Sequence, residues 1–264
     1  MGFIITTVTK VNEEIENHAK TLAEQFNKKY VLRGKFSLEK IKQDNNVDNL
    51  LIVTKDGLKA HTINGDLFFH LNMAQLRILN ITRQQQDHMI EAMDLSSGMS
   101  VLDCTLGLGT DAVVASFIVG ENGKVVGTES SELICLITKL GLKKFSHDNK
   151  DIQKSLQRIE VINEDYFEYM QSLADNSFDI VYFDPMFRRP IEDSTNFKPI
   201  RLIANMQQIS REALTEALRV AKKRVVIKET KDSLEFKRLN ITKLYGGKYS
   251  SVSYGVIEKG CKHE

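Results

Sequence analysis

The sequence predicts an α/β domain built on a mostly parallel seven-stranded sheet with helices on both faces, preceded by a small α+β module. In the larger part, near-continuous apolar strands alternate with helical segments, which is typical of a parallel sheet covered on both sides. Before it, short apolar segments are separated by Lys55-Asp56-Gly57 and Asn64-Gly65-Asp66, sequences that favour tight hairpin turns. We therefore expect the module at residues 1–81 and the larger domain at residues 82–264.

The module begins with an amphipathic helix and continues as a β-meander. Between Val11 and Lys29, apolar side chains recur at helical spacing among charged ones. The strands of the meander are predicted at residues 50–54, 58–63 and 67–69. A second helix, at about 82–95, then leads through Ser96-Ser97-Gly98 toward the first strand of the larger domain.

Strands and helices alternate along the larger domain. The parallel strands are predicted at residues 100–104, 124–128, 159–163, 178–183 and 224–228. The helices are predicted at residues 111–119, 131–144, 166–173 and 204–221. The last two segments, 241–245 and 249–257, flank Gly246-Gly247 and predict a closing hairpin, which would add an antiparallel edge to the sheet.

Composition narrows the class of protein. Apolar residues make up 42% and charged residues 27% of the 264, as in ordinary soluble globular proteins. The three Cys have no CxxC spacing and the His residues have no metal-ligand spacing, which argues against a disulfide framework and a metal site. No apolar stretch reaches the roughly 20 residues that span a bilayer. We expect a cytoplasmic protein without metal or membrane attachment, a monomer or a homodimer.

Charge is distributed unevenly along the chain. Residues 99–184 carry 7 basic and 14 acidic side chains, a balance of −7, whereas residues 185–264 carry 17 and 9, a balance of +8. This distribution is compatible with a cationic cofactor held by the acidic part and an anionic partner held by the basic part.

A glycine-rich turn between a strand and a helix predicts a nucleotide-type cofactor site. The stretch from Asp103 to Ala112 contains Gly107 and Gly109 and matches the GxGxxG/A fingerprint. Glycines in this turn let the backbone bend sharply and approach a ligand closely. Glu129 follows Gly109 by 20 residues, at the end of the next strand, where a carboxylate can bind ribose hydroxyls.

The acidic residues discriminate between two cofactors. Asp103 precedes the glycines, where it would repel the pyrophosphate of a dinucleotide. S-adenosylmethionine (SAM) instead carries a sulfonium and an ammonium group, which a carboxylate attracts. Asp165, just after the third strand, can reach an adenine amino group. We therefore favour SAM, while an NAD-dependent oxidoreductase, which accounts for the glycines and Glu129, stays open as an alternative.

A second cluster follows the strand at 178–183. This strand delivers Asp184 to the carboxyl edge of the sheet, where ligands of such folds bind, and Pro185 ends the strand there. Asp184 can accept a hydrogen bond from an exocyclic amine, and Phe187 offers a face on which a flat base can stack. A carboxylate and a neighbouring backbone carbonyl can hold such an amine and relieve the positive charge that it gains during methyl transfer.

With these motifs, residues 50–257 resemble the RsmJ-type family of class I methyltransferases, which modify guanine N2 in small-subunit (16S) ribosomal RNA. The resemblance rests on the Asp103–Asp111 loop, on the DPMF motif of Tyr182-Phe-Asp-Pro-Met-Phe187, and on the strand Arg224–Lys228. It implies a Rossmann-like fold with SAM as the cofactor. Arg188 departs from the family pattern, which has Pro here, and residues 76–83 replace a Gly- and Arg-rich segment.

The predicted site has three parts. The predicted catalytic residues are Asp184, Pro185 and Phe187. The predicted cofactor-binding residues are Asp103, Thr105, Gly107, Gly109, Asp111, Glu129, Ser130, Asp165 and Asp184. Basic residues that can contact RNA phosphates or face the substrate are Arg188, Arg189, Lys198, Arg201 and Lys228.

We accordingly expect a SAM-dependent methyltransferase that acts on an exocyclic amine of an RNA base, guanine N2 of ribosomal RNA. Two other readings stay open: a methyltransferase for a protein or small molecule, and a non-catalytic RNA-binding module.

Overall fold

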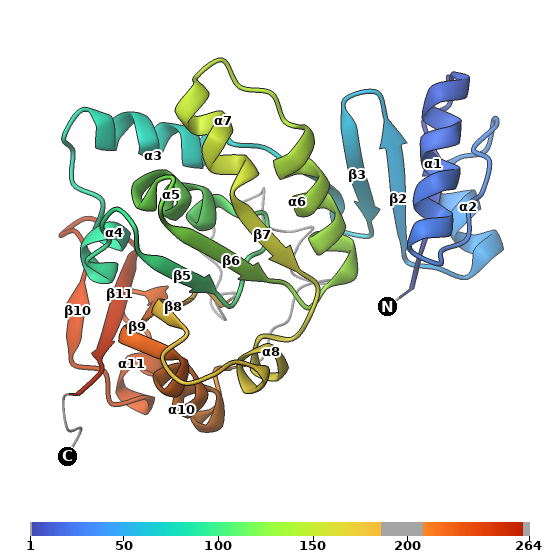
Figure 1. Ribbon diagram of the computed structural model, residues 1–264. Helices are drawn as coiled ribbons and strands as arrows, with labels where there is room; N and C mark the ends of the chain where they lie inside the picture. The colour runs from blue at the N-terminus through green and yellow to red at the C-terminus, as the bar shows by residue number, and fades with distance from the viewer. Residues whose placement is uncertain (1, 186–207, 261–264) are drawn as a thin grey trace.

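The computed structural model describes residues 2–185 and 208–260 and contains two sheets (Figure 1). The N-terminal sheet has the order β1-β2-β3-β4, formed by β1 (Phe3–Thr7), β2 (Asn49–Thr54), β3 (Gly57–Thr62) and β4 (Gly65–Phe68). The meander of β2, β3 and β4 is antiparallel, as the turn sequences predict. Strand β1, which the sequence analysis did not identify, pairs in parallel with β2 and is buried along its whole length.

Two helices cover the N-terminal sheet on opposite faces. Helix α1 (Glu13–Gln25) begins at Asn12, whose side chain accepts a hydrogen bond from the Ile15 amide, and packs with Phe3 and Ile5. Helix α2 (Leu38–Asn45), also missed from the sequence, buries Ile41 on the other face. The alternation along β1 explains this arrangement, because successive side chains of a strand point to opposite faces.

The larger sheet has seven strands in the order β10-β11-β9-β8-β5-β6-β7. Its parallel strands are β5 (Ser100–Asp103), β6 (Lys124–Thr128), β7 (Ile159–Ile162), β8 (Phe178–Phe183) and β9 (Ala221–Thr230). The hairpin of β10 (Lys243–Tyr245) and β11 (Val252–Glu258) adds the antiparallel edge. This topology confirms the predicted Rossmann-like fold class.

Helices cover both faces of this sheet (Figure 1). One face is packed by α3 (Asn72–Thr82), α4 (His88–Met93), α5 (Thr110–Val119) and α7 (Lys150–Gln157). The other face is packed by α8 (Tyr166–Ser172), α10 (Arg211–Val220) and α11 (Leu234–Arg238). The strands are therefore buried on both sides, which explains their near-continuous apolar sequences.

The segment before β5 differs from the single helix predicted at residues 82–95. It forms two helices, because α3 already ends at Thr82 and Asp87 starts α4 by accepting hydrogen bonds from the amides of Met89 and Ile90. The buried residues of α3, Ala74 and Ile78, belong to the core of the larger domain. The junction predicted at residues 81 and 82 thus falls within a segment that packs against the larger domain.

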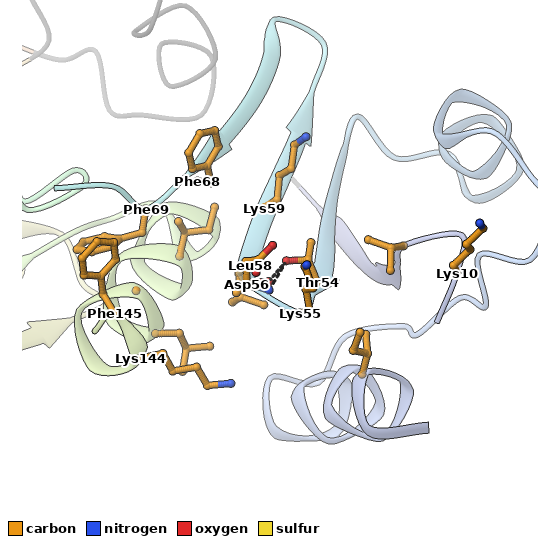
Figure 2. Close-up of a pocket in the computed structure, with 16 residues that line it drawn as sticks. Lys10, Thr54, Lys55, Asp56, Leu58, Lys59, Phe68, Phe69, Lys144 and Phe145 are labelled. Atoms are coloured by element: carbon orange, nitrogen blue, oxygen red, sulfur yellow. Dashed lines mark hydrogen bonds between the residues drawn. The ribbon is translucent and has the colours of Figure 1, made fainter. Parts of the chain in front are cut away.

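Helix α6 (Glu132–Lys144) joins the two parts of the molecule. Its Leu133, Ile134 and Ile137 share a core with the N-terminal sheet, while its Cys135 and Leu142 belong to the core of the larger domain. Near the end of α6, the rings of Phe69 and Phe145 lie edge to face with centroids 5.8 Å apart (Figure 2). A Cβ at Gly141 would overlap the Phe69 ring, so this helix position requires glycine for the two parts to meet.

Candidate active site

The carboxyl ends of the parallel strands bring the predicted polar residues to one edge of the sheet. Asp103 ends β5, Glu129 follows β6, Asp165 follows β7, Asp184 follows β8, and Lys228 lies on β9. In parallel sheets this edge is where ligands bind, since loops rather than packed helices close it.

The loop after β5 is held in shape by its neighbours. Gly107 and Gly109 have φ angles of +52° and +77°, in the left-handed region that glycine adopts without strain. The Thr138 hydroxyl donates a 2.6 Å hydrogen bond to the Gly107 carbonyl. Below the loop, a Cβ at Gly127 would overlap Leu106, so glycine in β6 lets the loop sit directly on the sheet. The loop is thereby preorganised to receive a ligand.

Glu129 ties this loop to the start of α6. Its buried carboxylate accepts hydrogen bonds from the Gly107 amide at 3.1 Å and the Ser131 amide at 2.8 Å. Burial raises the pKa of Glu129 above its ordinary value, against the effect of these two amides. Asn163 donates to the Glu129 carbonyl at 2.8 Å, while the neighbouring Ser130 is exposed. Glu129 thus connects the ends of β6 and β7 to the glycine loop.

Asp103 is a buried carboxylate suited to a cationic ligand. It is only 2% exposed and accepts a 3.0 Å hydrogen bond from the Thr105 amide. Burial raises the pKa of Asp103 to about 8, and the charges of Asp111 and Asp184 act in the same direction. A cation placed beside it would relieve this penalty, because an opposite charge favours the ionised form. The donor set therefore fits the ammonium and sulfonium groups of SAM better than a pyrophosphate.

Asp165 caps a helix at the same edge. Its side chain accepts a 2.8 Å hydrogen bond from the Phe167 amide and so starts α8. Next to it, the ring of Tyr166 packs edge to face on Phe183 with centroids 5.4 Å apart. A capping role does not use all the acceptor positions of a carboxylate.

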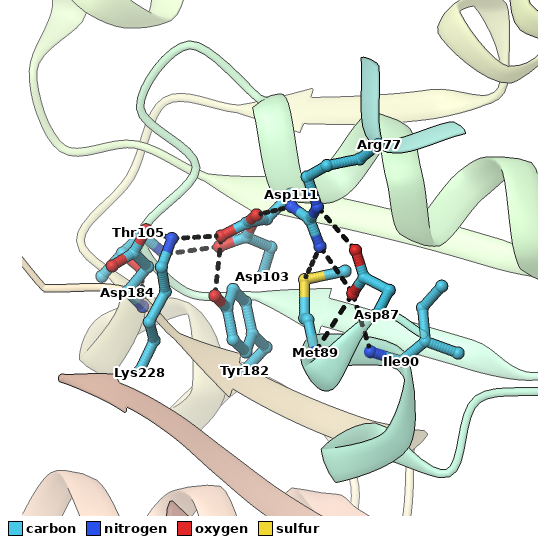
Figure 3. A network of polar contacts seen from close by, with 10 residues as sticks. All are labelled: Arg77, Asp87, Met89, Ile90, Asp103, Thr105, Asp111, Tyr182, Asp184 and Lys228. Carbon is cyan, nitrogen blue, oxygen red and sulfur yellow. Dashed lines mark hydrogen bonds and ion pairs between the residues drawn. The ribbon is translucent and has the colours of Figure 1, made fainter. Parts of the chain in front are cut away.

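Asp184 is fixed from two directions (Figure 3). Its amide donates a 2.6 Å hydrogen bond to the Thr105 hydroxyl, which joins the end of β8 to the glycine loop. Its carboxylate Oδ2 accepts a 2.7 Å hydrogen bond from the Lys228 ammonium. Burial raises the pKa of Asp184 to about 6, while Lys228 acts in the opposite direction. The Asp184 side chain keeps 29% of its surface exposed, so a substrate can reach it.

A chain of charges continues from Lys228 into the protein (Figure 3). Asp111 Oδ2 accepts hydrogen bonds from Lys228 Nζ at 3.0 Å and from the Tyr182 hydroxyl at 2.7 Å, and Asp111 Oδ1 pairs with Arg77 Nη1. Arg77 also holds Asp87 through two hydrogen bonds of 2.8 and 2.9 Å. Despite burial, Lys228 and Arg77 keep the pKa of Asp111 well below its ordinary value.

This network changes how two predicted residues are interpreted. Asp111, predicted to bind the cofactor, lies among Arg77, Lys228 and Tyr182, all of which bond to its carboxylate. Lys228, predicted to face the substrate, forms ion pairs with Asp111 and Asp184. These two carboxylates raise the pKa of Lys228 despite its burial. Arg77 is not among the site residues predicted from the sequence. In the sequence, Arg77 is only a single arginine in a segment before the cofactor domain, and its partner Asp111 lies 34 residues away, so no local pattern marks it as a site residue.

The other predicted residues can be located only in part. Pro185 follows Asp184 at the end of β8 and is half-buried. The remaining predictions lie outside the described residues, namely Phe187, Arg188, Arg189, Lys198 and Arg201.

The chain matches the model of a protein family described as "putative SAM-dependent methyltransferase" over residues 32–248. The protein belongs to this family. SAM is accordingly its cofactor, and the family match selects SAM over the dinucleotide that the glycines alone allowed. The residues at the carboxyl edge that fit SAM are Asp103 with its buried charge and Glu129 beside the glycine loop.

Individual proteins are similar to this chain over half of its length or more. YpiP of Bacillus subtilis (strain 168) is 37% identical over 256 residues, which is 97% of this chain and 99% of YpiP. The ribosomal RNA small subunit methyltransferase J of Francisella tularensis subsp. novicida (strain U112) is 31% identical over 143 residues, 53% of this chain and 57% of its own length. The match to methyltransferase J confirms the similarity to RsmJ-type class I methyltransferases that the motifs indicate.

A solved structure supports the fold of both parts of the described chain. The SAM-dependent methyltransferase NGO1261 from Neisseria gonorrhoeae superposes with a TM-score of 0.67 and 20% sequence identity, covering 97% of this chain and 96% of that one. At this level of identity the comparison concerns the fold.

Neither a membrane span nor a metal centre is found within residues 2–185 and 208–260. In that part of the chain, no helix has the length and apolar character needed to cross a bilayer. No group of three or more His, Cys, Asp or Glu side chains in the same described ranges is arranged to hold a metal ion.

Proposed function

We propose that this methyltransferase acts in the cytoplasm on the exocyclic amine of a base in ribosomal RNA, guanine N2 in the small subunit. The observation that carries the proposal is Asp184, an accessible carboxylate that follows β8 and is held between the Thr105 hydroxyl and Lys228. The relatives named as ribosomal RNA small subunit methyltransferase J support the choice of acceptor.

Two residues at the carboxyl edge would hold the cofactor. Asp103 would ionise fully beside the positive charges of SAM, and Glu129 would orient a ribose while keeping the glycine loop closed around it. When bound, SAM supplies a methyl group from a sulfonium centre. The buried position of Asp103 strengthens its attraction for a cation, because water screens the interaction less there.

Asp184 would orient and activate the acceptor. With a pKa of about 6, its carboxyl group is ionised at neutral pH and can accept a hydrogen bond from the amine. Lys228 engages Oδ2 and so holds the carboxylate in place. An aromatic amine is a weak nucleophile because its lone pair is delocalised, so Asp184 contributes by holding the nitrogen and by stabilising the positive charge that develops on it. Pro185 would keep this end of the strand rigid.

Replacement of Asp184 by Ala tests the assignment. We expect methyl transfer to fall at least a hundredfold, while binding of S-adenosylhomocysteine stays within a few-fold of wild type, because Asp103 and Glu129 are intact. The matched control is Asp232→Ala, which removes a carboxylate from an exposed position after β9 and should leave both properties unchanged.

Mass spectrometry of ribosomal RNA nucleosides, from cells with and without the gene, identifies the acceptor. Loss of one N2-methylguanosine supports the proposal. An unchanged nucleoside profile, or an Asp184→Ala variant with normal transfer, overturns it and turns attention to a protein or small-molecule acceptor.

A further inference from the structure

A second cavity lies away from the carboxyl edge, between the N-terminal sheet and the C-terminal end of α6. It has a volume of about 510 Å³, within the range of small-ligand sites. Figure 2 shows its walls, with the turn between β2 and β3 on one side and Lys144 and Phe145 of the larger domain on the other. None of the active-site residues that the structure describes lines it.

The rim of this cavity is positively charged. Its lining includes Lys10, Lys55, Lys59 and Lys144, against a single acidic residue, Asp56. Within the described parts of the chain, no ion pair involves Lys10 or Lys55, and both residues are exposed. The other two lysines contact groups nearby: Lys59 pairs with Asp66 at 2.5 Å, and Lys144 lies 3.1 Å from His18 Nε2. The rim is therefore suited to an anion.

Aromatic and aliphatic side chains line the cavity beneath this rim. Phe68, at the end of β4, is 51% exposed, and its strand partner in the register is Lys59. Phe69, Leu140 and Phe145 line the same cavity. An exposed ring beside ammonium groups matches the two repeating parts of a single-stranded nucleic acid, the flat base and the phosphate.

We propose that this cavity binds a nucleotide of single-stranded RNA that flanks the methylated position. Phe68 would stack on its base, while Lys10 and Lys55 would contact neighbouring phosphates. This inference rests on the proposed RNA acceptor. Helix α6 starts just after Glu129 and ends at the cavity, and its 13 residues span about 20 Å at 1.5 Å per residue. The cavity therefore lies about 20 Å from the cofactor side of the active site, a distance that an RNA strand of several nucleotides can span.

The concave shape of the cavity favours single-stranded RNA over a flat anionic surface as its ligand. The aromatic ring lies in a concave site between two parts of the protein, where a strand with separated bases can enter. Phosphate contacts of this kind raise affinity and fix the position of the strand without reading its sequence.

The test reverses the two lysines that are not engaged in ion pairs. A variant with Lys10→Glu and Lys55→Glu is compared with a control in which Lys35→Glu and Lys40→Glu change the net charge equally. Both control residues are exposed, and Lys40 lies on α2, on the opposite face of the N-terminal sheet. Fluorescence anisotropy with a labelled single-stranded RNA that contains the target guanine measures affinity at several salt concentrations, and thermal melts verify folding.

For the cavity variant we expect RNA binding about tenfold weaker than for the control. The slope of log affinity against log salt should become shallower by about 1.4, since two phosphate contacts are lost at about 0.7 each for a single strand. The KM for RNA should rise, while kcat at saturating RNA and S-adenosylhomocysteine binding stay unchanged. Phe68→Ala should weaken binding by about tenfold without changing the salt slope, because stacking releases no counterions.

The outcomes separate this inference from the proposed function. Equal RNA affinities of the cavity variant and the control, with active wild-type enzyme, overturn the cavity site alone. A wild-type protein that binds the RNA through the cavity but transfers no methyl group overturns the proposed acceptor and leaves the cavity site supported. A wild-type protein with no affinity for the RNA overturns both.

Discussion

Replacing Lys228 with Met removes the cation that lies between two acidic side chains. Lys228 Nζ is 3.0 Å from Asp111 and 2.7 Å from Asp184, and the side chains of Lys228 and Asp111 are 18% and 9% exposed. Loss of one partner from a buried ion pair costs about 3–5 kcal/mol, because it leaves a charge without compensation. Since Asp184 is 29% exposed and Arg77 still pairs with Asp111, we expect the lower end, about 3 kcal/mol.

The stability lost in the Lys228→Met variant depends on pH. In the wild type, Lys228 and Arg77 keep the pKa of Asp111 depressed, so this carboxylate contributes stability above its unfolded pKa, and the contribution is lost as pH falls through the folded value. Without Lys228, burial raises the pKa of Asp184 beyond about 6, so its ionised form is penalised at pH 8 and neutralised by a proton at pH 5. The difference between variant and wild type therefore shrinks as the pH falls.

Thermal melts followed by circular dichroism measure this effect. At pH 8 we expect the Tm of Lys228→Met about 6–12 °C below wild type, from about 2–4 °C per kcal/mol for a chain of this size, and a smaller difference at pH 5. Lys222→Met, on an exposed position of the same strand, is the matched control and should change stability by less than about 0.5 kcal/mol. A Lys228→Met variant that melts with wild type at both pH values would refute the reasoning, because the ion pairs would then carry no stability.

Three further predictions address the cofactor, the reaction and the junction between the two parts. In isothermal titration calorimetry, the affinity for SAM should increase by up to tenfold for each unit by which the pH rises toward about 8, the pKa of Asp103, because binding requires the ionised carboxylate. The Asp103→Asn variant should bind SAM weakly and with little pH dependence. If its affinity depends on pH as steeply as that of the wild type, the role of this carboxylate is contradicted. The kcat/KM of methyl transfer should rise with pH around an apparent pKa near 6, that of Asp184 in the free enzyme. A flat kcat/KM profile from pH 5 to 7 would argue against the ionised form of Asp184 as the active one. Gly141→Ala should lower the free energy of unfolding by about 1–3 kcal/mol in denaturant titrations, because the added Cβ overlaps Phe69. Gly2→Ala, which has open space around it, is the neutral control. Equal stabilities of the two variants would count against tight packing between Gly141 and Phe69.

Much of the fold and the location of the site could be predicted from local patterns. The alternation of apolar strands with helices determined the parallel sheet, and turn sequences such as Asn64-Gly65 located the meander. The strand–glycine–helix pattern at Gly107 and Gly109 and the acids after the strands indicated which edge would carry the chemistry. These features depend on residues close together in sequence, since φ preferences and strand periodicity are local properties.

The tertiary structure alone decided which charges meet. Asp111 and Lys228 are 117 residues apart, and Arg77 and Asp111 are 34 apart, so no local spacing predicts their contact. Strand β1 likewise depends for its backbone hydrogen bonds on β2, whose paired residues lie 46 positions later in the chain. A buried ion pair forms only where packing brings two distant side chains together and excludes water around them, which is why the partners of Asp111 could be assigned only after the chain was folded.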